Sequence, residues 1–207
     1  MNSKPKKKIT RIIIICVSVV FFVGCRPGVT KKTYENAVRD AFMFKYGQAV
    51  DIVNFKIENG RNIALVQLCD DRDLYIHIST DEHNEDLQDD YALAYLEHII
   101  EKDIDSNVHY YYSNYYVHVE IQGLKRFPPD VDFRELSLDE LMDYVDEEGS
   151  IDIFFYIDNA SLSSAFPLKD NKGFVNDSVV SKKCTTIQTI LTSTDELEEI
   201  RDKYQYE

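Results

Sequence analysis

The sequence predicts an α+β domain in which helices pack on one face of an antiparallel sheet, formed by a three-stranded meander plus two or three further strands. Segments whose apolar residues follow helical spacing alternate with segments in which every second residue is apolar. Asn59 and Gly60 favour the positive φ angles of a two-residue hairpin, and they join two of the alternating segments. Ser137 and Glu140 form a capping-box pattern before an apolar stripe, which is typical of a helix start.

The N-terminal half begins with an expected amphipathic helix over residues 33–46, which Gly47 ends. The alternating segments then predict the three antiparallel strands of the meander, over 51–57, 62–69 and 74–79. A long helical pattern follows from Asp90 and continues to Tyr111 or Tyr112. This order of elements places one helix before the meander and one after it.

The C-terminal half continues with an expected strand over residues 115–121. A helix is expected from Ser137, and Gly149 is its predicted end. Two more strands are predicted, over 151–157 and 185–191. Ser193 and Glu196 repeat the capping-box pattern before a short charged helix that closes the domain.

The first 25 residues follow the three-part pattern of an export signal. A positive segment without acidic residues comes first, and its basic side chains are Lys4, Lys6, Lys7, Lys8 and Arg11. An apolar run from Ile12 to Val23 follows. Residues 9–24 would form about 24 Å of helix, which is shorter than the roughly 30 Å of a bilayer core. The length therefore favours the apolar region of a signal over a stable membrane span.

The motif Val23-Gly24-Cys25 resembles the lipobox of bacterial lipoproteins, with Phe22 standing where Leu is usual. The resemblance implies cleavage before Cys25 and attachment of a diacylglycerol to the Cys25 thiol. Residues 1–24 are then a signal peptide, 25–32 a short tether and 33–207 a single extracytoplasmic domain, lipid-anchored on the outer face of the cytoplasmic membrane. The alternatives are an uncleaved anchor helix and a plain secreted protein, and both also export the domain.

The composition of the exported part argues against a nucleic-acid partner. Without the five basic residues of the signal, 18 of the 23 Lys and Arg remain against 37 Asp and Glu, which gives a formal charge of −19. A surface this negative repels phosphate backbones and lacks the basic patch that binds them. No glycine-rich phosphate loop or dinucleotide motif is present either, so we expect no cofactor.

Two cysteines remain after the signal and the predicted anchor are set aside, Cys69 and Cys184. An even pair outside the cell is compatible with a disulfide, which would close a long loop. Two buried free thiols are the equally weighted alternative.

A group of tyrosines near the middle of the chain is the predicted binding face, and it consists of Tyr110, Tyr111, Tyr112, Tyr115 and Tyr116. Tyrosine supplies rigid amphipathic area that can stack on sugar rings or anchor a protein partner. The alternative is that these rings pack inside the domain, because a chain without Trp must use other aromatics in its core.

A surface hydrolase is the second function considered, with His77 or His118 acting beside an Asp or Glu. The loop containing His77 and His83 is rich in acids, but it has no zinc or EF-hand spacing, and we interpret it as a solvated loop without metal. No serine-nucleophile motif is present.

The sequence therefore predicts a lipid-anchored binding or accessory module whose partner is a protein or an envelope glycan. A hydrolase, or an envelope protein of purely structural role, are the alternatives. The order of elements is also similar to that of surface lipoproteins of low-GC Gram-positive bacteria, a group with no established activity to transfer.

Overall fold

The computed structural model describes residues 31–81, 86–162, 175, 180 and 183–206. The predicted signal, Cys25 and His83 lie outside the described residues. Within the described ranges, no helix combines the length and apolar character needed to cross a membrane.

The N-terminal part of the chain forms helix α2 (Lys31–Tyr46) and a four-stranded antiparallel sheet. This N-terminal sheet has the order β1-β2-β3-β4, with strands β1 (Val50–Glu58), β2 (Arg61–Leu68), β3 (Tyr75–Thr80) and β4 (Gln88–Asp89). Asn59 and Gly60 have φ angles of 52° and 75°, so the predicted hairpin turn is confirmed. The meander of β1, β2 and β3 is likewise confirmed, and β4 adds a short fourth strand.

Helix α3 (Tyr91–Val108) leads into a second, C-terminal sheet. This sheet has the order β5-β6-β7, with strands β5 (Tyr115–Leu124), β6 (Val145–Asp158) and β7 (Cys184–Thr192). Strands β5 and β6 are antiparallel, whereas β6 and β7 are parallel. Helix α6 (Thr194–Tyr206) follows β7.

The predicted α+β class is confirmed, and the arrangement within it differs in two respects. The strands divide between two sheets instead of forming one. The helices of the C-terminal sheet also lie on both of its faces. Alternate residues of β5 point to opposite faces, so Val117 and Val119 enter the core on the side of α3 while His118 stacks on Tyr204 of α6.

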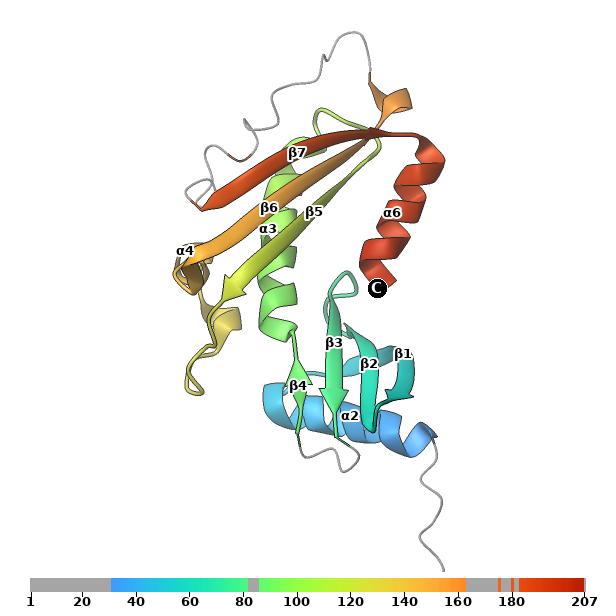
Figure 1. Ribbon diagram of the computed structural model, residues 1–207, viewed down its shortest axis with the longest axis vertical. Coiled ribbons are helices and arrows are strands. Elements are labelled where there is room, and N and C mark those ends of the chain that lie inside the picture. Colours follow the sequence, from blue (N-terminus) through green and yellow to red (C-terminus); the bar gives the residue numbers. More distant parts are fainter. Residues whose placement is uncertain (1–30, 82–85, 163–174, 176–179, 181–182, 207) are drawn as a thin grey trace, which may run out of the picture.

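Figure 1 shows how these elements are distributed along the molecule. Helix α2 lies at one end of the longest axis, across the N-terminal sheet, and the C-terminal sheet forms the opposite end. Helix α3 runs behind β5 and β6 and links the two parts. Fully buried residues from α2, both sheets and α3 belong to one hydrophobic core, among them Phe42, Ile76, Ile100 and Ile153.

The helix predicted from Ser137 to Gly149 is shorter than expected. The capping box of Ser137 and Glu140 is present, but α4 (Leu138–Met142) ends early and β6 begins at Val145. Gly149 lies inside β6, where a Cβ atom would stand 2.5 Å from the carbonyl oxygen of Gln122 on β5. The glycine is thus required by close strand approach and does not mark a helix end.

Candidate functional site

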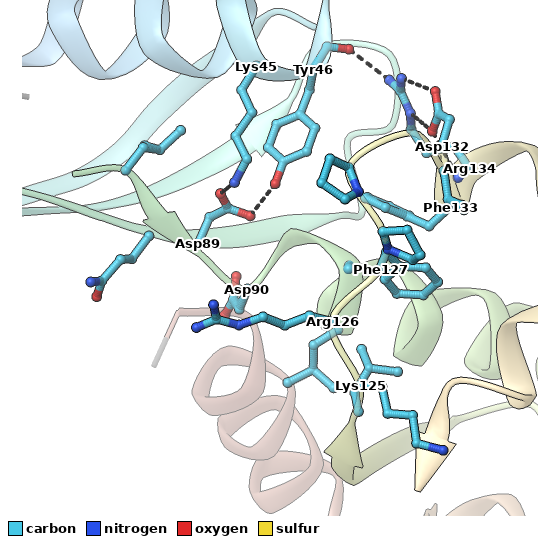
Figure 2. A pocket seen from close by; sticks show the side chains of 18 of the residues that line it. Lys45, Tyr46, Asp89, Asp90, Lys125, Arg126, Phe127, Asp132, Phe133 and Arg134 are labelled. Carbon is cyan, nitrogen blue, oxygen red and sulfur yellow. Dashed lines mark hydrogen bonds and ion pairs between the residues drawn. The ribbon is translucent and has the colours of Figure 1, made fainter. Parts of the chain in front are cut away.

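An open groove of about 1200 Å³ lies where the two halves of the chain meet. Its walls come from the end of α2, the β4–α3 junction, the end of β5 and the segment 125–134 that follows it (Figure 2). Residues that are far apart in the sequence therefore form one concave surface. Ligand sites in proteins are concave in the same way and combine apolar walls with a few polar groups.

Asp89 links the end of α2 to the start of α3 on one side of the groove. Its side chain is only 3% exposed, and it accepts bonds from Lys45 Nζ at 2.8 Å and the Tyr46 hydroxyl at 2.7 Å. Its Oδ1 also accepts from the backbone N–H of Tyr91 at 3.2 Å, at the start of α3. Burial and the bond to Asp89 raise the pKa of Tyr46 well above its ordinary value, so this hydroxyl stays a donor.

A second ion pair fixes the opposite side of the groove. Arg134 donates from Nε to Asp132 Oδ1 at 2.7 Å and also pairs through Nη2 with Asp132 Oδ2. A third bond runs from Arg134 Nη1 to the carbonyl of Tyr46 at 3.0 Å and ties the loop to the end of α2 (Figure 2). The hydrogen bonds from Arg134 lower the pKa of Asp132, so the pair is ionised at neutral pH.

Tyr46, Phe127 and Phe133 line the groove, and Tyr91 and Tyr95 pack behind them without lining it. We call these five aromatic residues the groove cluster. Tyr91 is central and only 1% exposed, and its ring centroid lies 4.9 Å from that of Tyr46 and 5.0 Å from that of Phe133. Burial raises the pKa of Tyr91 to about 12. These edge-to-face contacts pack the buried ring of Tyr91 against two rings that line the groove.

Apart from Asp130, Arg126 is the charged residue of the groove lining that has no partner among the described residues. Its side chain is exposed and, among the described residues, it has neither a salt-bridge nor a hydrogen-bond partner. Figure 2 shows it extending from the loop toward Asp90. The adjacent Pro128 and Pro129 are also exposed and present an apolar edge without backbone N–H groups.

The polar side chains that line the groove are carboxylates, amines, guanidinium groups, one amide and one phenol. None of its lining residues, all of which are described, is a Ser, Thr, Cys or His. Asp89 and Asp132 are already occupied by Lys45, Tyr46 and Arg134. These bonds link the end of α2, the start of α3 and the loop after β5.

The five tyrosines predicted as a binding face do not form one exposed surface. Tyr110 is 74% exposed, whereas Tyr112 is buried. Tyr111, Tyr115 and Tyr116 are half-buried, and the Tyr115 hydroxyl donates to Asp105 at 2.5 Å. The reason is physical, since the chain turns into the core after α3 and then alternates across β5, and a binding role for these tyrosines stays a prediction.

Tyr116 instead belongs to a second aromatic group, which we call the covered cluster: Tyr116, His118, Phe154, Tyr156 and Tyr204. The His118 and Tyr204 rings stack at 3.7 Å, and the Tyr156 and Tyr204 hydroxyls are 3.2 Å apart. Helix α6 therefore packs on the even-numbered face of β5 and β6. This supports the core-packing alternative for these tyrosines.

Carboxylates from α3 lie beside His118, at the free edge of β5. Glu101 accepts from the backbone N–H of Val119 at 3.0 Å, and Glu97 accepts from that of Ile121 at 2.9 Å. Burial raises the pKa of Glu97 to about 8, although the bond from Ile121 lowers it in part. These two side chains occupy the edge N–H groups that another strand could otherwise pair with.

Both histidines of the hydrolase alternative are beside carboxylates. His118 Nδ1 lies 3.4 Å from Glu101, under the ring of Tyr204, and His77 Nδ1 lies 3.0 Å from Asp90. Asp90 also accepts from the backbone N–H of His77 at 2.7 Å, so this pair joins β3 to the start of α3. No group of three or more metal-ligating side chains occurs among the described residues.

Cys69 and Cys184 are free, half-buried thiols in the structure. Cys69 directly follows β2 in the N-terminal sheet, and Cys184 begins β7 in the C-terminal sheet. The structure therefore shows the free-thiol alternative, and the disulfide stays a prediction. Burial raises the pKa of the Cys184 thiol, which makes it a weak nucleophile.

The groove was not predicted from the sequence. The Phe127-Pro128-Pro129-Asp130 segment indicates only a loop, and nothing local pairs it with Lys45 and Asp89. The one available signal is that Arg126 and the two prolines lie on a predicted loop, since loops carry a large share of binding residues.

Comparison with known proteins bears on the fold alone. No protein-family model and no curated protein matches this chain. A crystal structure of a DUF5037 family protein from Ruminococcus gnavus is similar, with a TM-score of 0.57 and 16% sequence identity over 83% of this chain and 80% of that protein. At this identity the likeness indicates that the two proteins have a similar fold.

Proposed function

We propose that the protein is a lipid-anchored extracytoplasmic binding module whose groove holds an extended segment of a protein partner. The observation that carries the proposal is an open groove, lined in part by Tyr46, Phe127 and Phe133, in which the Arg126 guanidinium and the Pro128–Pro129 edge are exposed. The export signal and Cys25 support the location on the outer face of the membrane.

The chemistry of the free groups suggests what the partner segment contains. An exposed guanidinium binds a carboxylate through two parallel hydrogen bonds. The prolines offer apolar contact without a competing donor. We therefore expect a partner segment with an acidic side chain next to an apolar one.

A glycan partner is less well supported at this site. Sugar rings usually stack on an exposed aromatic face, but Phe133 is buried and Phe127 is itself stacked on Tyr144 at 4.2 Å. Tyr110 is exposed, yet it lies outside the groove. A peptide segment needs no free aromatic face, so it fits the groove better.

Chemical crosslinking on intact cells, followed by mass spectrometry, tests the binding proposal. The native protein should give a recurrent envelope partner, and Arg126→Glu should reduce its recovery about tenfold, as expected for loss of an ion pair at a binding surface. Lys56→Glu is the matched control, because Lys56 is 61% exposed and lies on β1 outside the groove. Equal loss in both variants would mean that net charge, and not the groove, determines binding.

The anchor is tested separately with Cys25→Ala. This substitution removes the thiol that the lipid would occupy, so the protein should leave the membrane fraction or remain unprocessed. Unchanged processing and retention would contradict lipid attachment while leaving the groove proposal intact.

A further inference from the structure

Helix α2 carries an exposed apolar pair on the side opposite to its packed face. Val38 and Phe42 are fully buried against the N-terminal sheet, whereas Phe44 is 94% exposed and Met43 is 45% exposed. Single exposed apolar residues are common. Two adjacent ones at the end of an amphipathic helix form a patch, and such patches often contact a partner or a membrane.

The exposed stripe of α2 continues along the helix. We define the outer face of α2 as its exposed residues at helical spacing, which are Lys32, Asn36, Asp40, Met43 and Phe44. The first three are polar, with one positive and one negative charge, and the last two are apolar. At a membrane surface, an aromatic residue can enter the acyl boundary while charged residues stay near the headgroups.

The covalent chain limits how far this helix can be from the membrane. Six residue steps separate Cys25 from Lys31, where α2 begins. A fully extended chain spans at most about 3.6 Å per residue, so α2 starts within about 22 Å of an acylated Cys25. The helix itself is about 24 Å long, which keeps Phe44 within reach of the same surface. Figure 1 places α2 at one end of the molecule, where it can face a surface without the sheets intervening.

The charge of α2 also distinguishes it from the remainder of the protein. The helix has four basic side chains and two acidic ones, in a chain with a formal net charge of −14. Lys45 is one of the four and is paired with Asp89. The anionic headgroups of a membrane repel most of this protein, so α2 is the element that they repel least.

We propose that the outer face of α2 lies on the membrane surface, with the ring of Phe44 at the boundary between headgroups and acyl chains. This inference rests on the proposed lipid anchor, which brings the helix to the bilayer. It goes beyond anchoring because it fixes which side of the domain faces the lipid.

The absence of Trp from the chain provides a direct test. Phe44→Trp introduces one tryptophan, so the fluorescence of the acylated protein reports on this position alone. Tyr110→Trp is the matched control, because Tyr110 is 74% exposed and belongs to a different part of the surface. Each variant is bound to vesicles of phosphatidylglycerol and phosphatidylethanolamine, with and without bromine on the acyl chains.

The proposal predicts blue-shifted emission and about twofold quenching by brominated lipid at position 44, as expected for a ring near the acyl boundary. Position 110 should keep the emission of a solvent-exposed ring. Co-flotation with the vesicles without quenching at position 44 would overturn the inference and leave the anchor standing. If the protein does not co-float with the vesicles, both the inference about α2 and the lipid anchor are overturned. A third outcome is a blue shift at position 44 that depends on protein concentration, without quenching by brominated lipid. This result would overturn the inference and would mean that position 44 contacts a second copy of the chain.

Discussion

The groove cluster and the covered cluster use the same kind of residue in different surroundings. Both are built from aromatic rings at ring-stacking distances, with Tyr91 central to one and Tyr116 part of the other. The covered cluster is closed by α6, whereas the groove cluster has an open side bounded by Arg126 and two prolines. An aromatic-rich segment therefore indicates function only where the fold leaves it uncovered.

The largest expected effect comes from removing the base of the groove cluster. Tyr91→Ala should lower the free energy of unfolding by about 3–5 kcal/mol, because a large aromatic side chain leaves a cavity. Denaturant unfolding measures this. Tyr91→Phe keeps the ring and loses only the hydrogen bond to Gln48, so it should cost about 1 kcal/mol. Equal costs would show that the ring contributes little packing.

A substitution in the covered cluster should lower the stability of the protein and leave partner binding unchanged. Tyr204→Ala removes the ring that stacks on His118 at 3.7 Å and should cost about 2 kcal/mol, since Tyr204 is only half-buried. Partner recovery in the crosslinking experiment should stay unchanged under conditions where the variant is folded. A selective loss of the partner without loss of stability would move the binding site to α6.

A smaller effect, dependent on pH, is expected at the edge of β5. The pKa of Glu97 is raised from 4.5 to about 8 in the folded protein, so between these values the folded state holds a proton that the unfolded state releases. Stability should therefore fall as pH rises from 4.5 to 8. Glu97→Gln should be stabilising by about 1–4 kcal/mol at pH 8, and nearly neutral at pH 4.

Unfolding measured across this pH range checks the prediction for Glu97. The substitution keeps an oxygen that can accept from the N–H of Ile121. Glu198→Gln, at an exposed position of α6, is the matched control and should follow the native pH curve. If Glu97→Gln also follows that curve, its carboxylate is ionised when folded and the β5 edge is not a buried site.

The smallest effect is expected at the exposed tyrosine. Tyr110→Ser should change the free energy of unfolding by less than about 0.5 kcal/mol, because its side chain is 74% exposed. It should also leave partner recovery unchanged. Loss of the partner would restore the sequence-based prediction of a tyrosine face.

Local chemistry made much of the secondary structure predictable. The Asn59–Gly60 turn and the Ser137–Glu140 capping box each depend on neighbouring residues, and both are confirmed. The division into two sheets was not predictable in this way, because the parallel pairing of β6 with β7 is a contact between distant segments. Gly149 was misinterpreted for the same reason, since its constraint comes from Gln122 on another strand.

The site was harder to predict than the fold. The groove requires α2, the β4–α3 junction and the loop after β5 to meet, and each contributes only one or two polar groups. No segment by itself has a recognisable motif. The tyrosines are obvious in the sequence, but side-chain alternation along β5 decides which of them is covered.

Site-specific photocrosslinking tests the central claim most directly. A photoreactive amino acid is placed in the groove at Pro129 and, as the matched position outside it, at Tyr110. We predict that irradiated cells give a discrete crosslinked partner from position 129 and not from position 110, and that Arg126→Glu removes it. A partner captured from position 110 alone would contradict the assignment of the groove as the binding site.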